Sequence, residues 1–196
     1  MNTKNIIDCC FLVPNNSKKS YQKLSETYSA IEPPTWALLL AESIRSINFN
    51  PVIIDANAEN LDEEKIYERI QGIKPRLICL VVYGQNVNAG TTNMSGAVNL
   101  STFLKKKDSK IKICFIGSHV QALPKETLEK EKSIDFVFTN EGVYALRNIL
   151  NLKSFESEYL KKINGIAFRD KESIILNPSE KVVPTSRMDF DLPGYA

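Results

Sequence analysis

The chain has 196 residues, of which 43% are hydrophobic and 24% are charged, so it is long enough to bury the core of one domain and an appendage. Its 25 basic residues nearly balance its 23 acidic ones, and the net charge of +2 gives no basic field for binding nucleic acid. No stretch approaches the roughly 20 apolar residues of a membrane span, and the N-terminal apolar run lacks a small-residue cleavage pattern, so we expect no membrane partner.

Five short apolar runs follow one another along the first 140 residues. Their ranges are 6–13, 51–55, 77–82, 111–116 and 134–138. Each run is almost continuously hydrophobic, which is typical of parallel strands that are covered by helices on both faces.

Helical patterns fill the gaps between these runs. Pro33 and Pro34 suit a helix start, and Trp36 then lies on the apolar face of the pattern, where we expect it in the core. Asp62 is a capping residue ahead of an acidic first turn. Further helices are expected at 91–106, after Pro124 and at 141–151. The alternation predicts a doubly wound α/β domain over residues 1–152.

The pattern changes after residue 152. The segment "INGIAFRDKESIILNP" is typical of a β-hairpin, and we expect it to form an appendage within residues 153–178. Residues 179–196 contain prolines and show no periodicity, so they are interpreted as an extended tail and a linker.

The four cysteines, Cys9, Cys10, Cys79 and Cys114, all lie inside apolar runs. A free thiol in such a place behaves as a small hydrophobe, and the spacing matches no C-x-x-C pattern. We therefore expect a reduced, cytoplasmic setting and assign no metal ligand.

The loops that follow the predicted strands are where a ligand would bind, because ligands of open α/β sheets lie outside the carboxyl ends of the strands. They read "PNNSKKS", "YGQNVNAGTTN", "GSHVQ" and "TNEG". Neutral amides and hydroxyls suit a ligand with many neutral hydrogen-bonding groups better than a phosphate cluster or a bare metal. The alternative is that these residues simply form turns, which they favour in any protein.

Several familiar sites are absent from the sequence. It has no G-x-G-x-x-G after the first strand, no P-loop, and no acidic acceptor after the third strand, where it reads "VVYGQN". It also has no G-x-S-x-G turn for a nucleophile, so no catalytic residue is assigned.

Five segments, in this order, resemble the N-terminal cobalamin-binding domain of cobalamin-dependent radical S-adenosylmethionine enzymes. They are "EPPTWALLLAESIRSINFNPVIIDA", "IKPRLICLVVYG", "ICFIGSHVQALPKE", "IDFVFTNEGVYALRNIL" and "INGIAFRD". The usual Gly-Gly-Pro-His of that family corresponds to residues 116–119, which read Ile-Gly-Ser-His. Its Gly-Glu-Gly-Glu corresponds to residues 140–143, which read Asn-Glu-Gly-Val.

The resemblance implies a flavodoxin-like strand order of 2-1-3-4-5 and cobalamin bound over the strand ends. Together with the loops, it selects the following cofactor-binding candidates: Asn15, Asn16, Asp55, Tyr83, Gly84, Gln85, Asn86, Gly117, Ser118, His119, Asn140, Glu141 and Gly142.

Two of these candidates have a second explanation. Asp55 ends the second strand and could bind the ligand or cap a turn. Glu141 opens the last helix of the α/β domain, where its charge favours the helix dipole whether or not it contacts a ligand.

The resemblance also implies a division of labour. Radical chemistry needs three cysteines, usually spaced C-x-x-x-C-x-x-C, for a [4Fe–4S] cluster, and this chain lacks that spacing. The cluster and S-adenosylmethionine would then belong to a catalytic domain in cis or in trans, toward which residues 179–196 lead. The implied reaction is methyl transfer from methylcobalamin to a substrate radical, or else cobalamin-assisted redox or ring chemistry. Alternatives are a stand-alone cobalamin-binding module and a degenerate scaffold.

His119 is the only histidine of the chain. It could ligate cobalt, orient the corrin or a loop, or serve a structural role. Methionine-synthase-type cobalamin domains place their ligand histidine after the first strand, in a D-x-H-x-x-G motif, and residues 14–23 contain no histidine. We therefore predict that His119 is not the lower ligand of cobalt.

Overall fold

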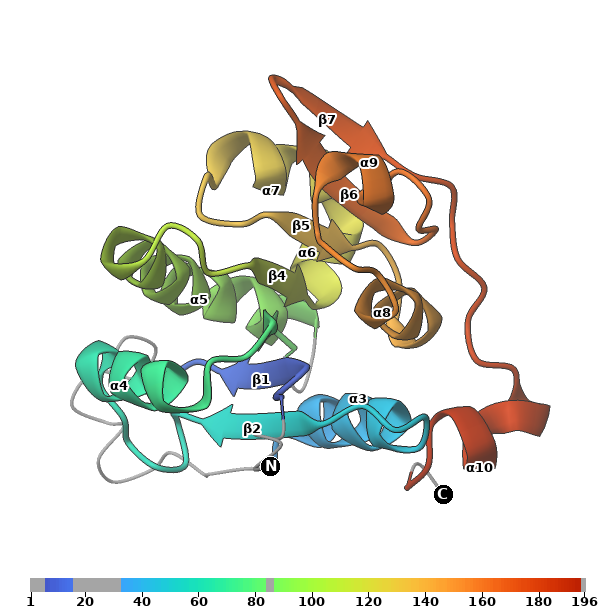
Figure 1. Cartoon of the computed structure of the whole chain (residues 1–196), viewed down its shortest axis with the longest axis horizontal. Coiled ribbons are helices and arrows are strands. Elements are labelled where there is room, and N and C mark those ends of the chain that lie inside the picture. The colour runs from blue at the N-terminus through green and yellow to red at the C-terminus, as the bar shows by residue number, and fades with distance from the viewer. Residues whose placement is uncertain (1–5, 16–32, 84–86, 195–196) are drawn as a thin grey trace.

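The computed structural model describes residues 6–15, 33–83 and 87–194. One sheet organises these residues, with the strand order β2-β1-β3-β4-β5-β6-β7. Figure 1 shows it from β2 at the bottom to β7 at the top. The strands are β1 (Cys9–Val13), β2 (Pro51–Asp55), β3 (Leu77–Val81), β4 (Ile113–Ile116), β5 (Phe136–Phe138), β6 (Ile166–Asp170) and β7 (Ser173–Leu176).

The first five strands are parallel, and their order 2-1-3-4-5 confirms the predicted flavodoxin-like arrangement. The predicted sheet of only five strands is wrong in detail, because the hairpin joins the same sheet. Strand β6 pairs antiparallel with β5, which places Phe168 opposite Phe136, and both rings are fully buried. Burial of these rings at the β5 edge gives the hairpin a physical reason to extend the sheet.

Helices cover both faces of the sheet, as the continuous hydrophobicity of the strands requires. Alternate residues of each strand point to opposite faces, so the core has two halves. One half lies under α3 (Thr35–Arg45), α8 (Val143–Leu150) and α9 (Ser157–Leu160). The other half lies under α4 (Glu63–Ile73), α5 (Val87–Lys107), α6 (Ser118–Ala122) and α7 (Pro124–Lys130).

Helix α4 shows how local sequence sets the ends of an element. The side chain of Asp62 accepts a hydrogen bond from the backbone nitrogen of Lys65 at 2.9 Å, which confirms the predicted cap. Lys74 ends the helix in the left-handed conformation with φ of 47°. Since strand β2 precedes this helix, its N-terminus lies at the carboxyl edge of the sheet.

Strand β7 is the last strand of the sheet, and its side chains are only partly covered. Leu176 is 48% exposed.

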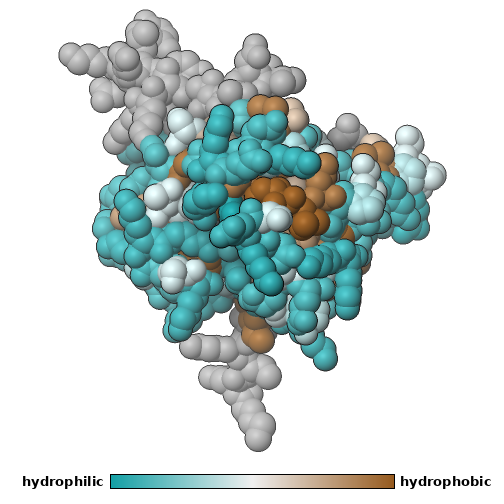
Figure 2. Space-filling model, turned by 90° about the horizontal axis from the view of Figure 1, so that it is seen from above, coloured by the Kyte–Doolittle hydropathy of each residue, from teal (hydrophilic) through white to brown (hydrophobic). Residues whose placement is uncertain are grey.

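Seen from above, the molecule is mostly hydrophilic around an apolar patch (Figure 2). Within the described ranges, none of the helices is long and apolar enough to cross a membrane.

Residues 178–192, which we call the C-terminal strap, run down the side of the molecule from β7 toward α3 (Figure 1). The strap begins as the extended tail that the sequence predicts, but it does not stay extended. It contains the 3₁₀ turn η2 (Thr185–Arg187) and the short helix α10 (Met188–Asp191).

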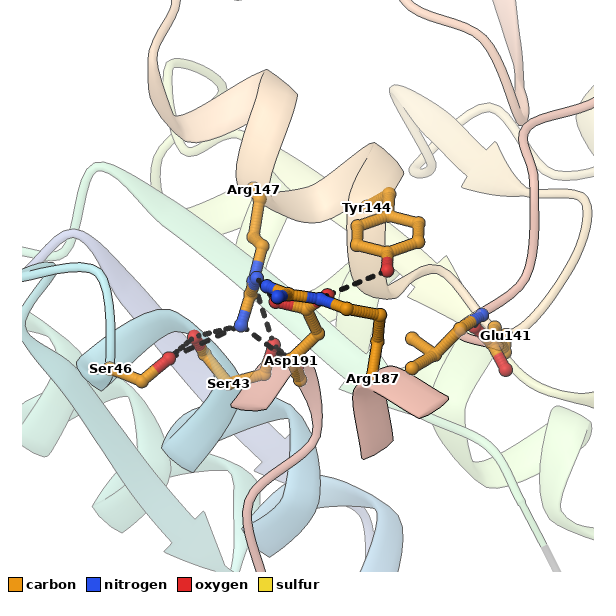
Figure 3. Close-up of polar contacts among 8 residues, drawn as sticks. Ser43, Ser46, Glu141, Tyr144, Arg147, Arg187 and Asp191 are labelled. Atoms are coloured by element: carbon orange, nitrogen blue, oxygen red, sulfur yellow. Dashed lines mark hydrogen bonds and ion pairs between the residues drawn. The ribbon is translucent and has the colours of Figure 1, made fainter. Parts of the chain in front are cut away.

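Asp191 is the main anchor of the strap (Figure 3). Its carboxylate accepts hydrogen bonds from Arg147 of α8 at 2.8 Å, from Tyr144 at 2.8 Å and from Arg187 at 2.9 Å. Its backbone oxygen accepts a further bond from the hydroxyl of Ser43 in α3 at 2.6 Å. The strap is therefore fastened across α8 and α3, the two main helices of one layer.

Candidate functional site

The carboxyl ends of the five parallel strands meet at one edge of the sheet, which we call the carboxyl edge. The loops after β1, β3, β4 and β5 lie there, and this is where open α/β sheets bind ligands. Four candidates, Asn16, Gly84, Gln85 and Asn86, lie outside the described residues. The structure distributes the others between the two sides of the sheet.

Tyr83 directly follows β3 and belongs to a connected polar unit. Its hydroxyl oxygen accepts a hydrogen bond from Nε2 of Gln121, and the same Nε2 donates to the backbone oxygen of Asn140 at 2.7 Å. Gln121 lies in α6, which follows β4, and Asn140 follows β5. One amide group therefore ties together the loops after three neighbouring strands.

Trp36 completes this unit from the first turn of α3. Its ring stacks on that of Tyr83, with centroids 4.8 Å apart and an interplanar angle of 22°. Trp36 packs against the core, as expected, but it remains partly exposed at the carboxyl edge. Burial raises the pKa of Tyr83 to about 12, so its phenol stays protonated across the physiological pH range.

Asn140 and Glu141 are occupied by the C-terminal strap. Nδ2 of Asn140 donates to the backbone oxygen of Glu180 at 2.9 Å, and Oε1 of Glu141 accepts from the backbone nitrogen of Val183. These contacts give both side chains a structural role that the sequence analysis did not anticipate.

The two glycines of the site are required by the packing of the chain itself. A Cβ at Gly117 would overlap the backbone oxygen of Val82, which directly follows β3. Gly142 begins α8 with φ of 77°, and a Cβ there would overlap the side chain of Ile116. Both glycines are explained without a ligand.

Ser118 and His119 form the start of α6, and both are half-buried. The backbone oxygen of His119 accepts a hydrogen bond from Leu123 at the end of this short helix. The helix thus places His119 after β4, two strands away from the loop after β1.

Asn15 lies on the other side of the sheet, beside a groove of about 630 Å³. Its Nδ2 donates to Oδ1 of Asn60 at 3.3 Å. Leu61, Leu100 and Phe103 contribute apolar surface to the groove, and the first turn of α4 contributes acidic side chains. The volume falls in the range of small-molecule sites.

Asp55 closes its own turn. Its Oδ1 accepts from the backbone nitrogens of Asn57 at 3.1 Å and Ala58 at 3.0 Å, which is the turn-capping role given above as the alternative to ligand binding.

The cysteines lie inside the sheet and away from these loops. All four are free and buried, and burial raises the pKa of Cys10 to about 12 and that of Cys9 and Cys114 well above the usual value. In the part of the chain that the structure describes, no group of three His, Cys, Asp or Glu residues could hold a metal ion.

Two functional candidates escaped the sequence analysis. Gln121 stands in the quoted loop "GSHVQ", but nothing local distinguishes it from an ordinary helix residue. Trp36 lies 47 positions before Tyr83, so only the folded chain shows that the two rings stack.

A doubly wound sheet with polar loops at its carboxyl edge defines a ligand-binding α/β domain of the flavodoxin type. The family model described as B12 binding domain matches residues 22–150. The chain therefore belongs to the B12-binding domain family, and cobalamin is its cofactor class.

Two relatives match most of this chain and a smaller part of their own length. The anaerobic magnesium-protoporphyrin IX monomethyl ester cyclase of Synechocystis sp. is 26% identical over 144 residues, which are 73% of this chain and 28% of that protein. An uncharacterized methyltransferase of Pyrococcus horikoshii is 23% identical over 163 residues, which are 83% of this chain and 33% of that protein.

Two solved structures share the fold. The radical S-adenosylmethionine methyltransferase TsrM of Kitasatospora setae, with tryptophan and a S-adenosylmethionine analogue bound, matches with a TM-score of 0.65 at 13% identity, over 88% of this chain and 30% of that one. The cobalamin-dependent enzyme OxsB, with aqua-cobalamin and S-adenosylmethionine bound, matches with a TM-score of 0.67 at 16% identity, over 91% and 23%. The chain thus spans about a third or less of the length of each of these proteins.

Proposed function

We propose that this domain binds cobalamin at its carboxyl edge and presents it to a radical S-adenosylmethionine methyltransferase domain. The observation that carries the proposal is the polar unit of Tyr83, Gln121 and Asn140 at the ends of three parallel strands, in a chain of the B12-binding domain family.

The chemistry of the available groups fits this cofactor. The corrin ring carries amide side chains around its rim, and each amide needs both a donor and an acceptor. The carboxyl edge offers the amide of Asn15 and the hydroxyls of Tyr83 and Ser118, which are neutral groups that can both donate and accept. His119 lies beside Ser118. We assign these four residues, and the backbone around Gly117, to contacts with the corrin or its nucleotide arm.

Bound cobalamin would supply a cobalt that carries a methyl group. The work of the chain is then to hold the ring, orient it and cover one of its faces. None of the residues assigned above is proposed as the lower ligand of cobalt. Methionine-synthase-type domains carry their ligand histidine after the first strand, and no histidine occurs in residues 14–23. We propose that the cofactor is held through its rim and arm rather than through a protein nitrogen on cobalt.

The catalytic partner is proposed from the relatives. OxsB is a S-adenosylmethionine radical enzyme, and a TsrM structure holds cobalamin together with a [4Fe–4S] cluster. We propose that the cluster and S-adenosylmethionine are supplied in the same way here, by a domain in cis or in trans, with residues 179–196 leading toward it.

A degenerate scaffold is the second candidate, and a specific observation favours it. Asn140 and Glu141 already bind the C-terminal strap, so they have less capacity for a ligand.

Gel filtration separates the two candidates. We expect the purified chain, mixed with hydroxocobalamin, to retain a coloured cofactor through the column. A colourless protein peak, with folding verified by circular dichroism, would contradict the cofactor proposal and leave the scaffold.

A further inference from the structure

The hydrogen-bond arrangement around Gln121 settles which way its amide faces. Its Nε2 lies within hydrogen-bond distance of the backbone oxygen of Asn140, and a carbonyl oxygen only accepts. The nitrogen must therefore stand on this side, and its second hydrogen reaches the hydroxyl oxygen of Tyr83. The amide of Gln121 is thus a donor toward the loops after β3 and β5 at once.

This donation leaves Tyr83 with an uncommitted proton. The hydroxyl oxygen accepts from Gln121, so its own hydrogen must point elsewhere. No acceptor for that hydrogen is found among the described residues. Tyr83 is only partly buried, so water can accept this hydrogen in the free chain, and a ligand oxygen can take the place of that water.

The ring of Tyr83 is also held in direction. Trp36 stacks on it from α3, and Gln121 fixes the hydroxyl from α6, so both ends of the side chain are restrained by separate elements. Restraint of this kind lowers the conformational entropy that a donor loses when it binds a ligand. The raised pKa of Tyr83 keeps the phenol a donor at neutral and alkaline pH.

We propose that Tyr83 donates a hydrogen bond to an acceptor oxygen of cobalamin, that Gln121 is the positioning residue that aims this donor, and that Trp36 is the wall that holds its ring. The inference rests on the proposed function, since it deepens the description of the same site. The acceptor is an oxygen of either the corrin amides or the phosphate of the nucleotide arm.

Three variants and two probes test the proposal. Trp36 is the only tryptophan of the chain, and cobalamin absorbs light at the wavelengths where tryptophan emits. Quenching of Trp36 fluorescence therefore reports binding in a titration, and equilibrium dialysis verifies the affinity. Hydroxocobalamin and cobinamide, which lacks the nucleotide arm, are titrated into the wild-type chain, Tyr83→Phe, Gln121→Leu and the double variant. Gln71→Leu in α4 is the matched control, and thermal unfolding of each variant reports on folding.

We expect Tyr83→Phe to weaken hydroxocobalamin binding by about two- to tenfold, which is the effect of one hydrogen bond. Gln121→Leu should cause a similar loss, and the double variant should lose little more than either single variant, because Gln121 acts through Tyr83. Gln71→Leu should bind as the wild type does. A loss seen with hydroxocobalamin alone identifies the phosphate as acceptor, and an equal loss with cobinamide identifies a corrin amide.

Two outcomes would overturn the inference while the proposed function stands. One is Tyr83→Phe that binds both probes as tightly as the wild type. The other is a double variant in which the two losses add fully, since Gln121 would then not act through Tyr83. If Gln121→Leu does not fold, Tyr83→Phe alone still decides the first point. A folded wild-type chain that binds neither probe would instead overturn the proposed function.

Discussion

His119 shows how a single residue is defined by its position in the fold. It lies after β4, at the start of α6, whereas the lower-ligand histidine of methionine-synthase-type domains follows the first strand. Imidazole is a common metal ligand, so its presence near a cobalt cofactor invites that assignment. Its place in the fold argues for a contact with the corrin or with its own loop instead.

We expect His119→Ala to leave the spectrum of bound cobalamin nearly unchanged and to weaken binding by about 0.5–1.5 kcal/mol, the value of one hydrogen bond. Electron paramagnetic resonance of the cob(II)alamin form is the sharper measurement, because an axial nitrogen splits the cobalt lines. Nitrogen splitting that is present in the wild type and lost in His119→Ala would show that His119 is a ligand after all.

At the scale of the element, the C-terminal strap depends on one buried carboxylate. Asp191 is 7% exposed, and its hydrogen bond with Arg187, followed by those with Tyr144 and Arg147, holds its pKa well below the usual range. A carboxylate whose pKa is lower in the folded state stabilises the fold above its unfolded pKa of about 4, and this stabilisation is lost as the pH falls through the folded value.

We therefore expect Asp191→Asn to lower the free energy of unfolding at pH 7 by about 2–4 kcal/mol, because Arg147 is left largely buried without its partner. The difference between the wild type and the variant should shrink as the pH falls below about 4. Urea unfolding at several pH values measures both effects. Asp189→Asn, an exposed carboxylate of the same short helix, is the control and should change little. An unchanged stability of Asp191→Asn at pH 7 would mean that the carboxylate of Asp191 adds nothing to the stability of the fold.

At the scale of the whole molecule, the four cysteines are part of the buried core. The four thiols are buried within three neighbouring strands, and burial raises the pKa of Cys9, Cys10 and Cys114 and keeps them protonated, whereas iron–sulfur clusters are held by thiolates.

We expect anaerobic reconstitution of the folded chain with iron and sulfide to give no stoichiometric [4Fe–4S] cluster. Visible absorption and iron analysis after desalting measure this, and a chain with the C-x-x-x-C-x-x-C spacing serves as the positive control. One cluster per chain would contradict the division of labour proposed for this domain and its catalytic partner.

The sequence alone determined the class of fold and the edge of the sheet at which the loops after the parallel strands meet. Runs such as 77–82 and 111–116 are continuously apolar because their strands are buried on both faces, and this signal is local. Parallel strands with helical crossovers must bring their carboxyl ends to one edge. The order of strands and helices along the chain therefore suffices to predict that the loops of Tyr83, His119 and Asn140 lie together.

Only the tertiary structure decided which groups meet at that edge and which are already occupied. The pairing of β6 with β5, the stacking of Trp36 on Tyr83 and the bond from Gln121 to Tyr83 each join residues more than 25 positions apart. Asn140 and Glu141 likewise find partners in the strap about 40 residues later. Local propensity carries no information on such contacts, because they depend on how the layers pack and on where the chain returns after the last parallel strand.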